Sequence, residues 1–249
     1  MKQGDNRIVG LIGCGAIGSL IAHAAEQGIV KCDKLILYDC EPEKAAALKK
    51  SLQFPSAIAS SVDEMLKLQP TVIVEAASQQ AVKEYMHQIV NSGVDLIVMS
   101  TGALIDMQIP SSKVHVPSGA IGGLDAISSA ALAGIDEVIL TTRKNPAALG
   151  RSIMRTEIVY DGNAEEAVQR FPREMNVAAT LALMVKPAKV KVRVIADPEV
   201  RRNTHEIQVK WQFGEMTLRF ANDPHPENPH TSALAAWSAI RLLQTLLDR

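Results

Sequence analysis

The sequence predicts an α/β fold in two domains, the first built on a doubly wound parallel sheet and the second on a mixed, partly antiparallel sheet. Up to about residue 100, short β-branched runs alternate with helix-like segments, which is typical of a parallel sheet. From Glu137 onward, longer segments alternate apolar and polar residues, which is typical of a sheet with one solvated face. We therefore expect a dinucleotide-binding domain at 1–108, onto which 230–249 packs back, and a substrate-binding, catalytic and dimerisation domain at 109–229.

The first predicted strand, Ile8–Ile12, runs directly into a glycine-rich turn. Gly13, Gly15 and Gly18 have the spacing Gly-x-Gly-x-x-Gly, and helix-like sequence continues to Glu26. Strand, turn and helix in this order form the phosphate-binding corner of a Rossmann-type domain, where backbone N–H groups at the helix start face a pyrophosphate. We therefore predict a dinucleotide cofactor that contacts Gly13, Gly15, Ala16, Ile17 and Gly18.

The second predicted strand, 34–38, ends at Asp39, which lies 21 residues after Gly18. A carboxylate about 20 residues after the glycine turn accepts the ribose hydroxyls of NAD and would repel the 2′-phosphate of NADP. No arginine follows in 40–43 to bind such a phosphate. We therefore predict Asp39 as a cofactor contact and NAD as the preferred cofactor, with NADP as the alternative. The competing role for Asp39 is to cap the helix-like segment Glu43–Lys50.

The rest of the first domain repeats this pattern, with predicted helices over 43–52 and 80–91 and strands over 71–77 and 95–100. In the second domain, Val190, Val192 and Val194 share one face of a strand. On the strand 204–211 we place His205 on the apolar face with Ile207, Val209 and Trp211. Residues 213–216 are expected to turn into a strand over 217–220.

The last segment has helical spacing of apolar residues from Ala233 to Leu247, with Thr231 or Ser232 as its cap. We expect this helix to return to the first domain.

Composition and charge narrow the class of partner. The 249 residues include 26 basic and 27 acidic side chains, and neither sign forms a long block. This distribution shows no block of like charge that would favour binding to nucleic acid or a membrane surface. The expected partners are therefore a small-molecule substrate and other protein chains. Cys14, Cys32 and Cys40 match no zinc or disulfide spacing, and the N-terminus has no signal-peptide core, so we expect a cytoplasmic location. No residue cluster has the spacing of a common metal motif, so no metal site is predicted.

Three features of the second domain are candidates for chemistry. The loop 115–125 is rich in glycine, which lets backbone amides touch a ligand, although glycines also suit a tight crossover. Asn176 precedes an apolar helical segment, where its side chain would cap the helix or hold a nicotinamide carboxamide. His205 is either a buried core residue or, at the start of its strand, a catalytic group.

Six stretches together resemble one family, the L-aspartate dehydrogenases. The glycine turn is shared by many dehydrogenases, whereas the loop Pro-Ser-Gly-Ala-Ile-Gly-Gly-Leu-Asp and the strand Asn-Thr-His-Glu-Ile are more specific. The resemblance is loose at 40–70 and 141–170. The six stretches run in order over nearly the whole chain, at 10–18, 74–79, 117–125, 171–180, 196–207 and 228–232.

The resemblance implies a reversible reaction in which L-aspartate gives a hydride to the nicotinamide and becomes iminoaspartate, which hydrolyses to oxaloacetate and ammonia. It also implies a homodimer and a supply of iminoaspartate to de novo NAD biosynthesis. His205 matches the active-site histidine, and an imidazole with an ordinary pKa of about 6.5 suits the proton transfers. Ala120 and Asn176 match cofactor contacts, to which we add Ala77. Candidate donors to the substrate carboxylates are Ser118, Gly119, Gly122, Gly123, Thr231 and Ser232.

Two alternatives stay open. Another two-domain reductase, of the homoserine dehydrogenase or dihydrodipicolinate reductase type, would have the same layout, although the paired-histidine and lysine signature expected of the latter is absent. A non-catalytic NAD-sensing protein would bind the cofactor without turnover, because a fold alone does not establish activity.

Overall fold

A computed structural model describes residues 7–109, 112–225 and 228–248, with the backbone alone at 224–225 and 228–231. The chain divides into two compact units. Unit 1 consists of Met1–Ala103, Gln108–Pro117 and Ala236–Arg249, and unit 2 consists of Leu104–Met107 and Ser118–Ala235. Residues 109–117, which the sequence analysis places in the second domain, belong to unit 1, where this segment supplies an edge strand of the sheet.

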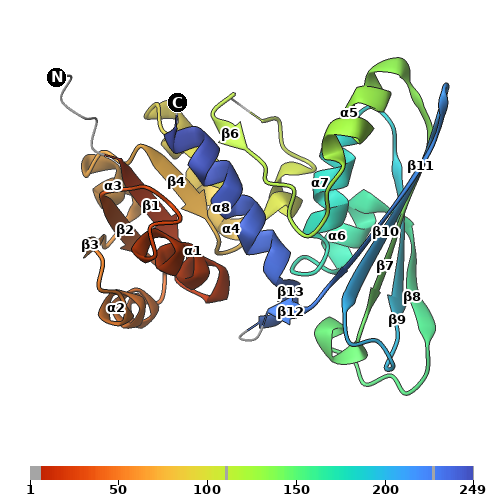
Figure 1. The fold of residues 1–249 in the computed structure, drawn as a ribbon, viewed down its shortest axis with the longest axis horizontal. Helices are drawn as coiled ribbons and strands as arrows, with labels where there is room; N and C mark the ends of the chain where they lie inside the picture. The colour runs from red at the N-terminus through yellow and green to blue at the C-terminus, as the bar shows by residue number, and fades with distance from the viewer. Residues whose placement is uncertain (1–6, 110–111, 226–227, 249) are drawn as a thin grey trace. The chain divides into compact units, whose positions relative to one another are not determined.

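Unit 1 is a six-stranded sheet in the order β3-β2-β1-β4-β5-β6 (Figure 1), and every pair of neighbouring strands is parallel. The predicted doubly wound parallel sheet is therefore confirmed. The chain order reverses between β1 and β4, which is where ligands bind in sheets of this kind. The strands are β1 (Ile8–Ile12), β2 (Lys34–Tyr38), β3 (Ser56–Ile58), β4 (Val72–Glu75), β5 (Asp95–Val98) and β6 (Val114–His115).

Helical crossovers separate the first five strands of unit 1, as parallel pairing requires. The short elements β3 and α3 have no counterpart among the predicted ones, because three strand residues and six helical residues carry too little periodicity to detect. The last helix packs in unit 1 as expected, and Gln244 Nε2 donates to the carbonyl of Ile29 at 2.7 Å. The helices are α1 (Ala16–Glu26), α2 (Pro42–Ser51), α3 (Val62–Lys67), α4 (Gln79–Asn91), the 3₁₀ turn η1 (Thr101–Leu104) and α8 (Ala233–Leu247).

Unit 2 contains a mixed five-stranded sheet in the order β11-β10-β7-β9-β8 (Figure 1). Strands β7 and β9 are parallel and the other neighbours are antiparallel, which confirms the predicted mixed, partly antiparallel sheet. The strands are β7 (Ile135–Lys144), β8 (Glu157–Asn163), β9 (Val190–Ala196), β10 (Asn203–Trp211) and β11 (Gly214–Asn222), with a separate pair of strands β12 (Pro224–His225) and β13 (Asn228–Ser232). The helical segments are α5 (Leu124–Ala133), η2 (Pro146–Leu149), α6 (Ala164–Arg170) and α7 (Asn176–Val185).

One face of the unit 2 sheet forms a hydrophobic core with α5, α6 and α7. Val190, Val192 and Val194 are buried in it, as their alternation predicts. The hairpin after β10 differs from the prediction, because β11 begins at Gly214 and not at residue 217. The antiparallel register continues through Lys210–Glu215, so the turn consists of the two residues Gln212 and Phe213 alone. Within the described residues, no helix combines the length and apolar character needed to cross a membrane.

Candidate functional site

The glycine turn lies at the carboxyl end of β1, and two of its glycines are required by close backbone packing. Gly13 has a φ of +97°, and a Cβ there would stand 2.7 Å from the carbonyl of Ala76. A Cβ on Gly18 would overlap the carbonyl oxygen of Gly13, so only glycine lets α1 pack this closely on the turn. Both roles agree with those of the dinucleotide fingerprint.

The start of α1 has the features of a phosphate site. No atom lies within 4 Å of the position where Gly15 would carry a Cβ, so the space above this backbone is open. Ala16 and Ile17 form the first turn of α1, which contains no acidic side chain. The N–H groups and the positive end of the helix dipole therefore suit a pyrophosphate.

Asp39 is joined to the glycine turn by a hydrogen bond. Its Oδ2 accepts from the backbone N–H of Cys14 at 2.8 Å, and its Oδ1 accepts from the N–H of Glu41 at 3.0 Å. The N-cap of α2 is Glu41. The helix-capping alternative for Asp39 is therefore wrong, and the carboxylate stands at the end of β2 against the turn that would hold the pyrophosphate.

A buried carboxylate, which the sequence analysis missed, organises the next strand ends. Glu75 is buried, and its two oxygens accept from the N–H of Ala77 at 2.8 Å, the N–H of Ser78 at 2.9 Å, and the N–H and hydroxyl of Ser100 at 3.0 and 2.9 Å. Burial raises the pKa of Glu75, and these four donors oppose that rise. The sequence feature that could have revealed this buried carboxylate is the glutamate directly after the apolar run Val72–Val74.

The bond from Ala77 to Glu75 fixes the turn between β4 and α4, in which we predict a cofactor contact. The N–H of Ala77 is thus occupied within the protein, and a contact with the cofactor would use its other atoms.

In unit 2, the predicted catalytic residue His205 is only 2% exposed and lies opposite Thr142 of β7. The Oγ1 atom of Thr142 is 3.0 Å from Nδ1 of His205. Burial, with a further contribution from the charge of Lys144, lowers the pKa of His205 to about 3. The histidine is therefore neutral at neutral pH, and its pKa lies well below the ordinary value of about 6.5 that the sequence analysis assumed.

Lys144, which the sequence analysis did not single out, is 3% exposed and ends β7. It lies two residues from Thr142, so both side chains share the face of the sheet that carries His205. Burial lowers the pKa of Lys144 to about 8, while the charge of Glu174 acts to raise it. The sequence feature that could have revealed a buried lysine is the alternation of Val138, Leu140 and Thr142, because it places Lys144 on the same face as these residues.

Two further polar side chains are buried near the same end of β10. Asn203 Nδ2 donates to the hydroxyl of Ser232 at 3.4 Å, and both residues are buried. Ser232 directly precedes α8, as expected. The side chain of Thr231, the other predicted substrate ligand of this segment, lies outside the part of the chain that the structure describes.

The predicted substrate loop, 118–123, packs on β11. Asn222 Nδ2 donates to the carbonyl of Ala120 at 2.9 Å, and a Cβ on Gly122 would stand 3.4 Å from the ring of Phe220. Phe220 is the cross-strand partner of His205, so the structure brings this loop close to the histidine.

The glycines of this loop have a structural role. A Cβ on Gly123 would overlap Leu218 of β11, and Gly119 and Gly123 have φ values of +68° and +70°. Close packing and a positive φ thus explain Gly123, and a positive φ alone explains Gly119. A contact of Gly119, Gly122, Gly123 or half-buried Ser118 with substrate stays a prediction.

Asn176 is the first residue of α7, whose N-cap is Met175, so the helix-capping alternative for Asn176 is wrong. The residue lies two positions after Glu174, the carboxylate that acts on Lys144. Its predicted contact with the cofactor stays a prediction.

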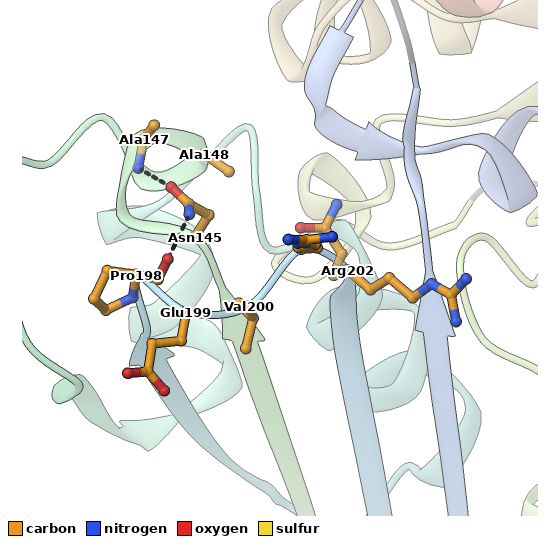
Figure 2. Close-up of a pocket in the computed structure, with 9 residues that line it drawn as sticks. Asn145, Ala147, Ala148, Pro198, Glu199, Val200 and Arg202 are labelled. Carbon is orange, nitrogen blue, oxygen red and sulfur yellow. Dashed lines mark hydrogen bonds between the residues drawn. The ribbon is translucent and has the colours of Figure 1, made fainter.

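Figure 2 shows a pocket of about 560 Å³ in unit 2, at the loops that follow β7 and β9. Asn145 ties the two loops together, because its side chain accepts from the N–H of Ala147 at 3.1 Å and donates to the carbonyl of Pro198 at 3.4 Å. The pocket is lined by Asn145, Ala147, Ala148, Pro198, Glu199, Val200, Arg201, Arg202 and Asn203. Among all described residues, no three His, Cys, Asp or Glu side chains gather as a metal site requires.

A parallel sheet with a dinucleotide-binding turn, together with a second unit that carries a buried histidine, defines the class of two-domain nicotinamide-dependent dehydrogenases. Comparison with known proteins makes the assignment specific. Residues 125–246 match the family described as aspartate dehydrogenase, C-terminal, and residues 13–111 match the NAD binding domain of homoserine dehydrogenase.

Full-length relatives give the same result. The chain is 44% identical to the L-aspartate dehydrogenase of Archaeoglobus fulgidus, over 97% of this chain and 98% of the relative. It is 40% identical to the L-aspartate dehydrogenase of Methanothermobacter thermautotrophicus, over 97% of this chain and 96% of the relative. The crystal structure of aspartate dehydrogenase from Thermotoga maritima superposes with a TM-score of 0.75 and 30% identity, over 97% of both chains. The chain belongs to the L-aspartate dehydrogenase family and is an oxidoreductase.

Proposed function

We propose that the protein catalyses the reversible oxidative deamination of L-aspartate with NAD, forming iminoaspartate and then oxaloacetate and ammonia. The observation that carries this proposal is the buried pair of His205 and Thr142 in a chain with a dinucleotide-binding turn. The relatives named L-aspartate dehydrogenase support the choice of substrate.

The cofactor site would be formed in unit 1 by the turn residues Gly13 to Gly18, with Asp39 at the ribose. The open space over Gly15 and the unobstructed start of α1 fit a pyrophosphate. When bound, the oxidised nicotinamide accepts the hydride that leaves Cα of the substrate. Asp39 and the adjacent Glu41 give this end of β2 a negative character, which supports NAD over NADP.

His205 would transfer the protons. The substrate amine must lose a proton before its lone pair can form the C=N bond as hydride leaves, and a neutral imidazole accepts such a proton. If Nδ1–H donates to Thr142, Nε2 keeps the free lone pair that this step requires. Water then adds to the C=N bond of iminoaspartate, and loss of ammonia gives oxaloacetate. In the reductive direction, protonated His205 would give its proton to the carbinolamine hydroxyl as water leaves.

The decisive experiment follows the absorbance of reduced nicotinamide with the purified protein, L-aspartate, and NAD or NADP. L-glutamate, L-alanine and L-homoserine serve as controls. Turnover confined to L-aspartate is expected, with a preference for NAD. NAD binding without turnover of any of the four amino acids would instead support the sensor alternative, and turnover of L-homoserine alone would support the other reductase.

The activity of His205→Ala separates a catalytic histidine from a core one. We expect kcat to fall by about 10²–10⁴-fold with unchanged NAD affinity. Loss of folding without a specific loss of kcat would favour the core role.

We further propose that the protein works as a cytoplasmic homodimer and that its iminoaspartate feeds de novo NAD biosynthesis. The exposed apolar side chains of Ile158 and Phe213 in unit 2 are candidates for a dimer contact. Light scattering of the purified protein tests the subunit number, and a monomer at micromolar concentration would reject the dimer.

A further inference from the structure

Unit 2 contains a buried lysine, Lys144, whose positive charge would suit the dicarboxylic substrate of the proposed reaction. Lys144 is almost fully buried, on the same sheet face as Thr142 and His205. A buried ammonium group is costly unless an anion or a good set of hydrogen bonds compensates it. Burial of this lysine therefore requires a compensating interaction, and the charge of Glu174 supplies part of it.

Several predicted substrate ligands already serve the fold. Gly123 is required for packing against Leu218, Gly122 lies against Phe220, and the hydroxyl of Ser232 accepts a bond from Asn203. None of these groups carries a positive charge, whereas L-aspartate has two carboxylates. A charge-assisted bond from an ammonium group is about twice as strong as a neutral one, so a lysine is better suited to this ligand.

The end of β7 also opens on a space of suitable size. Asn145, the residue after Lys144, lines the pocket of about 560 Å³ together with Asn203, which is two residues from His205. Arg201, Arg202 and Glu199 line the same pocket, and Arg202 forms an ion pair with Asp223 at 3.0 Å. A four-carbon dicarboxylate in this pocket would contact Asn145 and Asn203, which are close in sequence to Lys144 and His205, although the latter two do not themselves line the pocket.

We propose that Lys144 binds one carboxylate of the dicarboxylic substrate and so holds the amino acid against His205. The proposal rests on the proposed function, since it deepens the account of the same site. The proposal also links Lys144 to the protonation of His205. A bound carboxylate neutralises the charge that opposes protonation of His205, so substrate binding would strengthen the imidazole as a proton acceptor.

The test compares Lys144→Met and Lys144→Gln with Lys191→Met, a matched control that removes a half-exposed lysine from the neighbouring strand β9. For both Lys144 variants we expect the KM for L-aspartate to rise about 100-fold. The dissociation constant of succinate, measured by calorimetry on the NAD-saturated protein, should rise similarly. The affinity for NAD should stay within about twofold, and the control should match the wild type in all three quantities.

A folded Lys144 variant with unchanged KM and unchanged succinate binding would overturn the proposal. If neither variant folds, succinate must shift one lysine ¹⁵Nζ resonance of the wild-type protein, and the absence of any shift overturns the proposal equally. Failure of the proposed function looks different, because the wild type would then turn over no L-aspartate with either cofactor.

Discussion

Thr142 and His205 lie directly opposite each other on β7 and β10, and the hydroxyl oxygen of Thr142 is 3.0 Å from Nδ1 of His205. Residues 63 positions apart in the chain thus form a polar pair on a largely apolar sheet face that also carries the buried Lys144. The bond orients the ring, and with Nδ1 as its donor it would leave Nε2 for the proposed proton transfer.

The first prediction concerns this bond. Thr142→Val keeps the shape of the side chain but removes the hydroxyl, so the imidazole loses its orienting partner. We expect kcat for L-aspartate to fall about 10-fold or more, with an unchanged dissociation constant for NAD. Thr142→Ser, which keeps the hydroxyl, should restore most of the rate. Equal rates for the valine and serine variants would show that the bond does not position His205.

The second prediction follows from the low pKa of His205. The folded chain holds this pKa at about 3, whereas the unfolded chain has it near 6.5. Between these values the unfolded state binds a proton that the folded state does not, so stability is full above about pH 6.5 and is lost as the pH falls. The free energy of unfolding should therefore drop about 2 kcal/mol more between pH 7 and pH 5 in the wild type than in His205→Gln.

Urea denaturation of the two proteins at each pH measures this difference. The carboxylates of both proteins titrate alike, so the subtraction isolates His205. Parallel pH profiles would contradict the buried, neutral histidine.

The third prediction concerns cofactor choice. Asp39→Ala removes the carboxylate at the end of β2 that would accept the ribose hydroxyls and repel a 2′-phosphate. We expect the affinity for NAD to fall about 10-fold and its margin over NADP to shrink, as measured by fluorescence titration of both reduced cofactors. Glu43→Ala, which removes an exposed carboxylate from the first turn of α2, is the control. A constant ratio of the two affinities would remove Asp39 from this role.

The fourth prediction concerns Glu75. Glu75→Gln places an amide N–H₂ among four donors, so at least one of the bonds to Ala77, Ser78 and Ser100 is lost. We expect the free energy of unfolding to fall by about 1–3 kcal/mol, and NAD to bind more weakly because the turn after β4 loosens. Ser100→Ala removes only the hydroxyl bond and should cost less. A glutamine variant as stable as the wild type would show that the charge of Glu75 is dispensable.

The sequence by itself determined much of the architecture. The glycine spacing after Ile8–Ile12 and the period-two face of Val190, Val192 and Val194 predict the two kinds of sheet, because both patterns are local. Local sequence also identified His205 as a candidate and the glycine turn that contains Gly13 and Gly18 as a dinucleotide-binding turn.

Only the tertiary structure decided what surrounds these residues. Thr142 and Lys144 lie on β7 and His205 lies on β10, two strands far apart in sequence, and the proximity of these residues depends on the register of the two strands. The bonds between Asp39 and Cys14 and between Glu75 and Ser100 likewise join ends of different strands. Periodicity reports which face a side chain occupies but not which partner faces it, because strand order and register arise from packing of the whole unit.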